Sequence, residues 1–381
     1  MSTLVKRAVC WLLRSGVYVL SQDDAQYGAV YSYYDARHGH CRLIYAEATG
    51  YVLSFLRNLH AASPEERLTA AARASGDWLL RAVESRNGAV SMGFQGADEI
   101  PRAYAFDNGI CCRGLLDVYE LTGDARYLTG ARRIAEWLMR EALNRDGSVK
   151  AVLDLDSGRF VNGSAAWYTA SGSFHAKIAI PLLQLYAVSG ERPCRDAALS
   201  MCEWALARQR ADGAFPANVV TSSVNLHAHC YTVEALLYAY AIERRPSFLE
   251  AAERAVGWAI ARQRRDGSLP LWHGGRLWAP RASYAIAQIV RLCVLLHAWQ
   301  RRSYLVEAAE RAAGFLAGMQ VSSDDPRTDG GFLGQDAERA GIRIRRNAQV
   351  TSWATMFAAQ ALDLVERSTS LDFDDGVRRL F

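Results

Sequence analysis

The sequence predicts an all-α fold, an (α/α)6 toroid in which six inner helices are ringed by six outer ones. Three observations predict it: a helix-and-turn signature recurs six times, each copy precedes a more apolar helix, and links between these hairpins are short while links inside them are long. The copies lie roughly 54–67 residues apart and leave no room for another domain. We therefore predict one toroid domain over residues 1–381.

Each copy of the signature begins with a helix that carries Trp or Phe near its end and continues into a polar turn containing glycine. The aromatic residues, each with its turn, are Trp11 with 27–30, Trp78 with 87–90, Trp137 with 146–149, Trp204 with 212–215, Trp258 with 266–269, and Phe315 with 329–332. The first helices, such as 249–261 and 306–317, alternate Ala and Leu with Glu and Arg. This pattern is typical of amphipathic helices on the outside of a ring.

The second helix of each hairpin is more apolar. The six expected inner helices are 44–59, 107–121, 173–188, 227–242, 282–299 and 349–365. Few charges interrupt these segments, so we expect them to be buried on most faces. Strands are expected only as short pairs near the glycine turns.

Link lengths give the ring its two faces. The links from an inner helix to the next outer helix are short, as at 122–125, 189–193 and 243–246. The links inside a hairpin are long, roughly 15–30 residues, which is unusual unless they build a site. All the long links lie where the inner helices begin, so we expect a site on that face, beside helix N-termini that favour anionic groups.

The composition excludes several classes of protein. Half the residues are apolar and 22% are charged, which is typical of a folded chain with a large core. The balance of 44 Lys and Arg against 40 Asp and Glu argues against a nucleic-acid partner. No apolar stretch reaches membrane-spanning length, because Arg14 interrupts the first one. The eight cysteines show no disulfide spacing, so we expect reduced thiols in a cytoplasmic protein. The sequence does not indicate an oligomeric state.

Two carboxylates stand at the start of expected inner helices. Glu47 belongs to the first and Asp107 to the second. Glycoside cleavage needs a proton donor for the leaving oxygen and a second carboxylate as base or nucleophile, and adjacent helices about 8–10 Å apart could supply both. We expect Asp107 to be the acid and Glu47 the base or nucleophile. The reverse assignment is the alternative. The alternative is structural, because Asp is a preferred N-cap and either acid could pair with an arginine.

Histidines and cations form a second group of candidates at the same helix starts. His227 is the third catalytic candidate, while His229, two residues along, cannot share its helix face. Residues expected to bind substrate, in part through a carboxylate, are His175, Lys177, His229, Arg281 and Arg346. The cysteines and histidines lack the ligand spacing of a zinc site, so no metal is expected.

Aromatic residues at the same positions form a third group. They are Tyr45, Tyr51, Tyr231, Tyr284 and Trp353, with the amide of Gln349 beside them. Flat amphipathic rings suit the apolar faces of sugars, and their polar groups bind hydroxyls. Each ring taken alone could equally belong to the core. Together they favour an elongated polar ligand.

Two turns resemble a motif of squalene-type terpene cyclases, the QW motif. These are Gln209-x-x-Asp212-Gly213-x-Phe215 and the corresponding turn from Gln263 to Leu269. The resemblance implies a need for an acidic protonation motif. The nearest match to its Asp-x-Asp-Asp pattern is Asp154-Leu155-Asp156-Ser157, which lacks the last acid.

The whole chain resembles an uncharacterised branch of the six-hairpin carbohydrate-active toroids, associated with bacterial surface-polysaccharide genes. The matching segments are 45–51 (Tyr-Ala-Glu-Ala-Thr-Gly-Tyr), 106–109 (Phe-Asp-Asn-Gly), 227–232 (His-Ala-His-Cys-Tyr-Thr) and 353–357 (Trp-Ala-Thr-Met-Phe). The departures Ala46 and Asn108 leave both acids intact, and His229 is outside the pattern. In addition, 225–229 is similar to a segment of N-acylglucosamine 2-epimerase relatives, which implies a sugar substrate.

These observations lead to one expected function and several rivals. The expected function is a glycoside hydrolase acting on an acidic, uronate-containing bacterial polysaccharide or oligosaccharide, without a cofactor. The first rival is a polysaccharide lyase or sugar epimerase in which His or Tyr abstracts a proton. The others are a terpene-cyclase-like enzyme and a non-catalytic saccharide-binding toroid.

Overall fold

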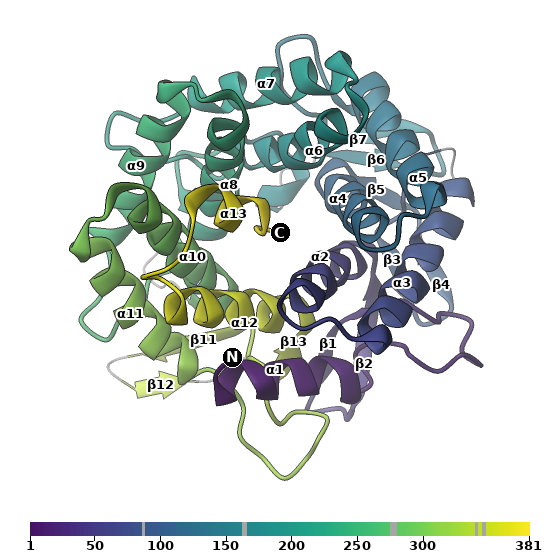
Figure 1. Cartoon of the computed structure of the whole chain (residues 1–381), viewed down its shortest axis with the longest axis horizontal. Helices are drawn as coiled ribbons and strands as arrows, with labels where there is room; N and C mark the ends of the chain where they lie inside the picture. Colours follow the sequence, from purple (N-terminus) through teal and green to yellow (C-terminus); the bar gives the residue numbers. More distant parts are fainter. Residues whose placement is uncertain (86–87, 162–165, 275–279, 340–341, 345–347) are drawn as a thin grey trace.

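The computed structural model describes residues 1–381 except 86–87, 162–165, 275–279, 340–341 and 345–347. Helices alternate between an inner and an outer layer around the ring, so the predicted (α/α)6 toroid is confirmed (Figure 1). The outer helices are α1 (Thr3–Arg14), α3 (Glu66–Ser85), α5 (Ala125–Trp137), α7 (Arg192–Leu206), α9 (Pro246–Ile260) and α11 (Ser303–Ala317). The inner helices are α2 (Ala46–Ala62), α4 (Ala105–Thr122), α6 (Ala179–Ser189), α8 (Leu226–Glu243), α10 (Ser283–Gln300) and α12 (Ser352–Glu366).

The inner helices begin close to the predicted positions, with two informative exceptions. The third starts as a 3-10 helix, η3 (Ser173–Ile178), before α6. Pro181 lies in the first turn of α6, where its ring and missing N–H disfavour an α-helix running back through η3. The sixth starts at Ser352, because residues 349–351 form a strand.

The long links contain more β-structure than the sequence indicates. A five-stranded antiparallel sheet has the order β13 (Gln349–Thr351), β1 (Tyr31–Asp35), β2 (His40–Tyr45), β3 (Gly93–Gln95) and β4 (Asp98–Ile100), and so joins the sixth, first and second hairpins. Three smaller sheets comprise β5 (Arg102–Tyr104), β6 (Val152–Asp154) and β7 (Arg159–Val161); β8 (Val224–Asn225) and β9 (Trp272–His273); and β10 (Arg281–Ala282), β11 (Gln335–Arg339) and β12 (Ile342–Ile344). These sheets tie each link to the link of a neighbouring hairpin.

The glycine turns explain why the signature repeats. Gly213 has a φ of +92°, and a Cβ there would lie 2.6 Å from the carbonyl oxygen of Arg254 in the next outer helix. Gly330 makes the same approach to Arg7 of α1, at 2.5 Å, and thereby closes the ring between its last turn and its first helix. Only glycine combines a positive φ with this close packing. The turn is therefore the joint between adjacent hairpins.

The glutamines of the QW-like turns strengthen the same joint. Gln209 Nε2 donates to the carbonyl oxygens of Gly213, at 3.0 Å, and Ala251, at 2.7 Å. Gln263 repeats this with Gly267 and Ala308, at 3.2 and 2.9 Å. The motif is thus explained by packing between hairpins.

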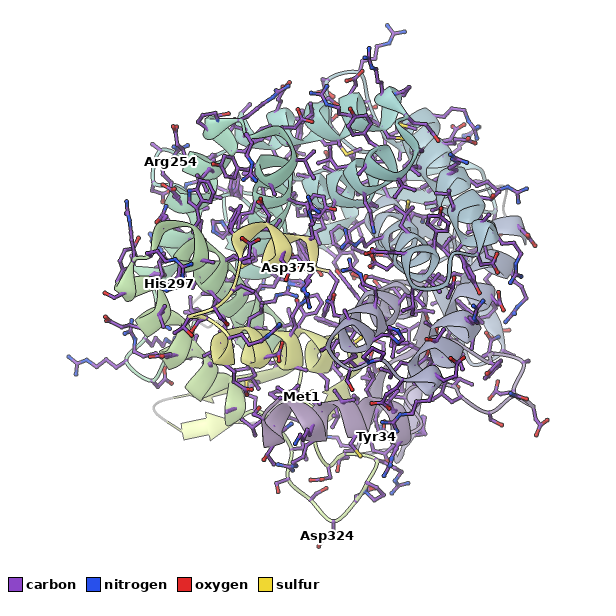
Figure 2. All side chains as sticks on the ribbon, viewed as in Figure 1. Met1, Tyr34, Arg254, His297, Asp324 and Asp375 are labelled. Carbon is purple, nitrogen blue, oxygen red and sulfur yellow. The ribbon has the colours of Figure 1, made fainter. Side chains whose placement is uncertain are left out.

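The C-terminal segment closes the ring at the ends of the inner helices opposite the long links. Helix α13 (Phe373–Arg378) lies over the central region of the ring, and the labelled Asp375 marks its place there (Figures 1 and 2). The carbonyl oxygens of Arg378 and Arg379 accept hydrogen bonds from Arg113, at 2.6 Å, and Gln360, at 2.7 Å. The ring of Phe381 packs against those of Tyr51, Phe55 and Phe357. We call residues 373–381 the C-terminal plug. Among the described residues, no helix is long and apolar enough to cross a membrane.

Candidate active site

Short strands run directly into five of the inner helices, and this junction places the candidate residues. Strand β2 ends at Tyr45, and Glu47 lies in the first turn of α2. Strand β5 leads into α4, where Asp107 occupies the same position. Strand β8 ends at Asn225, whose side chain accepts the N–H groups of His227 and Ala228 and caps α8. Because the strands fix the helix starts, the first turns converge on one end of the ring.

Glu47 and Asp107 interact directly across this end. The phenol of Tyr45 lies near both carboxyl groups and lowers the pKa of each. Neither acid caps its helix, since Tyr45 and Tyr104 are the N-cap residues and make no side-chain cap bond. Asp107 is 5% exposed, and its Oδ2 has no hydrogen-bond partner among the described residues. A buried carboxyl oxygen left without a fixed partner is suited to an incoming group.

The two acids differ in their protonation. Burial raises the pKa of Glu47 to about 7, while hydrogen bonds from Tyr45 and Tyr51 and the charge of Lys177 oppose the rise. Burial and the nearby charge of Glu47 hold the pKa of Asp107 well above its usual range. Two interacting carboxyl groups titrate as a pair, and both of these keep their protons to a higher pH than isolated acids do.

A pair of tyrosines extends the network inward. The hydroxyl groups of Tyr51 and Tyr231 are hydrogen-bonded at 2.8 Å, and both side chains are buried. Tyr51 also lies near Glu47 and lowers its pKa. Burial raises the pKa of both phenols well above the usual range, so both remain protonated at neutral pH.

His227 borders this network, because its ring packs against that of Tyr231. Its Nδ1 lies 2.5 Å from Oε1 of Gln288, and since an amide oxygen only accepts, Nδ1 carries the proton and Nε2 is a free base. Burial lowers the pKa of His227 to about 3. Its ring lies against Tyr231, Tyr284 and Trp353, with centroids 4.2, 4.6 and 5.7 Å away. His227 is thus a neutral, oriented imidazole in an aromatic setting.

Lys177 belongs to a buried charge cluster. Its Nζ lies 2.5 Å from Glu234 Oε2, and Glu234 Oε1 lies 2.6 Å from Nη2 of Arg291, which also donates from Nη1 to Gln360 at 2.7 Å. Lys177, Glu234 and Arg291 are at most 2% exposed. Two cations and one anion leave one positive charge in the cluster, and the charge of Lys177 lowers the pKa of Glu47. Lys177 therefore acts within the protein and is not free to meet a substrate carboxylate as the sequence suggests.

Arg281 is also committed to protein carboxylates. Its Nε and Nη2 lie 2.8 and 3.0 Å from the two carboxylate oxygens of Asp336, and its Nη1 lies 3.2 Å from Asp266. The residue is 3% exposed. This pairing joins strands β10 and β11, so it stabilises the links instead of presenting a charge to a ligand. Arg346 lies outside the described residues.

His229 lies in the joint between two adjacent hairpins. Its Nδ1 accepts the N–H of Phe215 at 3.1 Å, and its Nε2 donates to the carbonyl oxygen of Ala255 at 3.1 Å. Asn108 Oδ1 accepts the N–H of Val90 at 2.8 Å in the equivalent place. Both ring nitrogens of His229 are thus used by the backbone, which differs from the substrate contact expected from the sequence.

The remaining expected residues occupy varied places. Burial lowers the pKa of His175 to about 4; its Nδ1 contacts the backbone of Gly172 at 3.2 Å, and its Nε2 is buried without a partner among the described residues. Tyr284 accepts a hydrogen bond from Gln335 at 2.8 Å and stacks near Trp353, at 4.3 Å. Gln349 lies at the start of β13, paired with Asp35 of β1.

Several residues of the site are absent from the sequence-based candidates. They are Gln288, Glu234, Arg291 and Trp167. The first three lie in the interiors of inner helices, where a charged or amide side chain in an apolar segment is the available signal, because such groups are buried only with partners. Trp167 lies in a link, and its ring contacts those of Phe174 and His227 at 5.0 and 6.3 Å.

Two other expectations concern metals and the cyclase-like acid. Among the described residues, no group of three or more His, Cys, Asp or Glu side chains is arranged to hold a metal ion. Asp154 lies at the exposed turn between β6 and β7, where its Oδ1 accepts hydrogen bonds from the N–H and hydroxyl of Ser157. That carboxylate completes a turn and is not part of the Glu47–Asp107 network.

The comparisons with known proteins identify the fold. No protein-family model matches the sequence, and no curated protein matches it. A cellobiose 2-epimerase from Bacillus thermoamylovorans is similar with a TM-score of 0.78 and 13% identity, over 96% of this chain and 100% of that one. A D-mannose isomerase gives 0.77 and 8%, over 95% and 96%. An unsaturated glucuronyl hydrolase from a Bacillus species gives 0.70 and 16%, over 95% and 97%. The structural similarity shows a shared fold, and at these low sequence identities it shows the fold alone.

Proposed function

We propose that the protein is a carbohydrate-active enzyme, a glycoside hydrolase that acts on an acidic, uronate-containing saccharide. The observation that carries the proposal is the interacting carboxyl pair Glu47 and Asp107, which lies beside Tyr45 at the end of the ring where the strands meet the inner helices. The names of the similar structures, sugar epimerases, a sugar isomerase and a glucuronyl hydrolase, support a sugar substrate.

The unequal protonation of the pair gives each acid a role. Asp107, whose carboxyl retains its proton, protonates the oxygen of the glycosidic bond as that bond breaks. Glu47, whose pKa lies near 7, accepts a proton from the attacking water or attacks the sugar carbon itself. The aromatic rings of Tyr284 and Trp353 offer stacking faces for the sugar. NMR can identify which anomer of the product forms first. Inversion of the anomeric configuration would indicate that Glu47 acts as a base, and retention that it acts as a nucleophile.

The test is incubation of an acidic oligosaccharide panel with the protein in D₂O, followed by mass spectrometry. We expect fragments with water added across the broken bond. Asp107→Asn and Glu47→Gln should each reduce the rate by about 10²–10⁴-fold, the usual contribution of an acid or base. Unsaturated fragment ends, or full activity in both variants, would exclude this mechanism.

His227 supports a second candidate function, sugar epimerisation. A neutral imidazole with a protonated Nδ1 fixed by Gln288 has its basic Nε2 available to remove a carbon-bound proton. In the same D₂O experiment, an epimerase would leave the chain unbroken and introduce carbon-bound deuterium. His227→Ala would then reduce the exchange more than either carboxyl variant does.

We also propose that the chain acts as one domain in the cytoplasm. The ring of hairpins runs from α1 to the C-terminal plug, and all eight cysteines are free thiols, as is usual in a reducing compartment. A thiol titration of protein freshly isolated from its host would test the second point.

A further inference from the structure

An acidic sugar needs a cation that the protein has not already neutralised. Lys177 and Arg281, the expected partners of a substrate carboxylate, are both buried in ion pairs with protein carboxylates. Arg208, just after α7, differs from them: it makes no ion pair within 4.0 Å in the part of the chain that the structure describes, and it faces a cavity.

The cavity lies on the face of the long links and has a volume of about 370 Å³. Its base is the start of η3 at Gly172 and Ser173, and its wall is the link that follows α7. The wall residues include Arg208, Asn218, Val219 and Thr221. A space of this size is sufficient for one sugar ring, since ligand sites begin near 300 Å³.

Arg208 is exposed at this wall and is held in one orientation. Its guanidinium carbon lies 3.3 Å from the centre of the Trp204 ring, and Nη1 donates to the carbonyl oxygen of Trp204 at 2.9 Å. The other nitrogens keep donors for a ligand, and a planar guanidinium held in place matches a carboxylate with little loss of freedom. Desolvation lowers the pKa of Arg208, a cost that a bound anion would offset.

Trp167 connects this cavity with the candidate active site. Asn218 Nδ2 donates to the carbonyl oxygen of Trp167 at 3.0 Å, and Val219 N–H donates to that of Ser171 at 2.9 Å. The ring of Trp167 in turn lies 6.3 Å from that of His227. Trp167 thus contacts the wall of the cavity through its carbonyl oxygen and the ring of His227 through its own ring.

We propose that this cavity is a subsite for the carboxylate-bearing ring of an acidic saccharide, with Arg208 binding the carboxylate and Thr221 a hydroxyl group. The inference rests on the proposed function in taking a sugar as ligand. The hydroxyl of Thr221 accepts the N–H of Ser223 at 3.1 Å, so its own proton is available to a sugar oxygen. Tyr168 and Val219, which are 46% and 57% exposed, provide nearby apolar surface for a ring face.

The chain contains a matched control for Arg208. Arg262 stacks on Trp258 at 4.2 Å and donates from Nη1 to its carbonyl oxygen at 2.8 Å, in the next hairpin. Arg208→Gln and Arg262→Gln therefore remove the same structural contacts, while only the first removes the proposed ligand contact. Equal thermal unfolding of the two variants would establish that the comparison is fair.

The experiment measures binding of glucuronate, glucose and inorganic phosphate by saturation-transfer NMR. We expect glucuronate to bind more tightly than glucose, Arg208→Gln to weaken glucuronate binding about tenfold or more, and Arg262→Gln to change it less than twofold. The inference is overturned if Arg208→Gln binds glucuronate like the unmodified protein, if glucose binds equally well, or if phosphate displaces glucuronate at equal concentration.

A further comparison separates this inference from the proposed function. Asp107→Asn should abolish turnover of an acidic oligosaccharide yet leave glucuronate binding at Arg208 intact. Arg208→Gln should raise KM for that oligosaccharide with little change in kcat. Turnover with an unchanged KM in Arg208→Gln would exclude the subsite while the carboxyl mechanism stood.

Discussion

At the scale of single residues, unlike surroundings give two similar carboxyl groups different chemistry. Burial raises the pKa of both acids, and Tyr45 lowers both. Tyr51 and Lys177 lower the pKa of Glu47 further, whereas the charge of Glu47 raises that of Asp107. The positions of Glu47 and Asp107 could be predicted, because an acid in the first turn of an inner helix must lie at the ring's end. The joint role of His229 could not, since its partners Phe215 and Ala255 are fixed only by packing between hairpins.

The first residue-scale prediction is a bell-shaped dependence of kcat/KM on pH. Activity should rise as pH passes about 7, because Glu47 then loses its proton and becomes a base. It should fall again at higher pH as Asp107 loses the proton that it must donate. The two apparent pKa values belong to the pair. Glu47→Gln should remove the rising limb from any residual activity; a rising limb that survives would assign it to another group.

The second residue-scale prediction concerns Lys177. Its charge lowers the pKa of Glu47, so Lys177→Met should raise that pKa above 7 and move the rising limb to higher pH. The variant also leaves Glu234 with one of its two cations, and losing one partner of a buried ion pair typically costs about 3–5 kcal/mol of stability. Lys177→Arg retains the charge and is the control. Carbon-13 NMR of labelled carboxyl groups measures the pKa directly, and an equal value in both variants would contradict the argument.

At the scale of elements, the helices followed from apolar periodicity while most strands did not. An inner helix such as α8 carries its own signal in eighteen consecutive residues. A strand such as β13 has three residues, and its partner β1 lies more than 300 positions away, so no local pattern indicates the pairing. The glycine turns were visible as repeats, but their purpose became clear only from their contacts.

The element-scale prediction tests those turns. Gly267 has a φ of +84°, and a Cβ there would lie 1.9 Å from the carbonyl oxygen of Arg311. Gly158 has a φ of +66° with nothing within 4 Å of such a Cβ. We expect Gly158→Ala to cost about 1 kcal/mol for the backbone alone and Gly267→Ala distinctly more, because the hairpins must separate. Urea unfolding measures both, and equal losses would mean that the joint tolerates a side chain.

At the scale of the whole molecule, the buried histidines make stability depend on pH. Burial lowers the pKa of His175, His227, His229 and His273 to about 4, 3, 4 and 4, so the folded protein excludes protons that the unfolded chain binds below pH 6.5. Stability is therefore complete above 6.5 and falls as pH drops toward 4. The raised pKa values of Glu47 and Asp107 act in the opposite direction over part of this range. Four histidines against two acids leave a net uptake of about two protons on unfolding.

The corresponding measurement is the free energy of unfolding in urea between pH 4.5 and 6.5. It should rise with pH by about 2.7 kcal/mol per unit for a net difference of two protons. His229→Asn, which places the side chain of Asn108 in the equivalent joint, should flatten the slope by one proton. A stability that is independent of pH, or that declines over this range, would contradict the neutral state of the buried histidines.

The closure of the ring between its first and last helices has a consequence for synthesis. Helix α1 buries Val5, Trp11 and their neighbours against elements from the end of the chain, and Gln320 reaches the carbonyl oxygen of Leu4 across 316 positions of sequence. Helix α1 is synthesised before these partners, so its apolar face stays uncovered until the sixth hairpin has been made. The nascent protein is an open arc that is prone to aggregate, and only the last hairpin turns it into a ring.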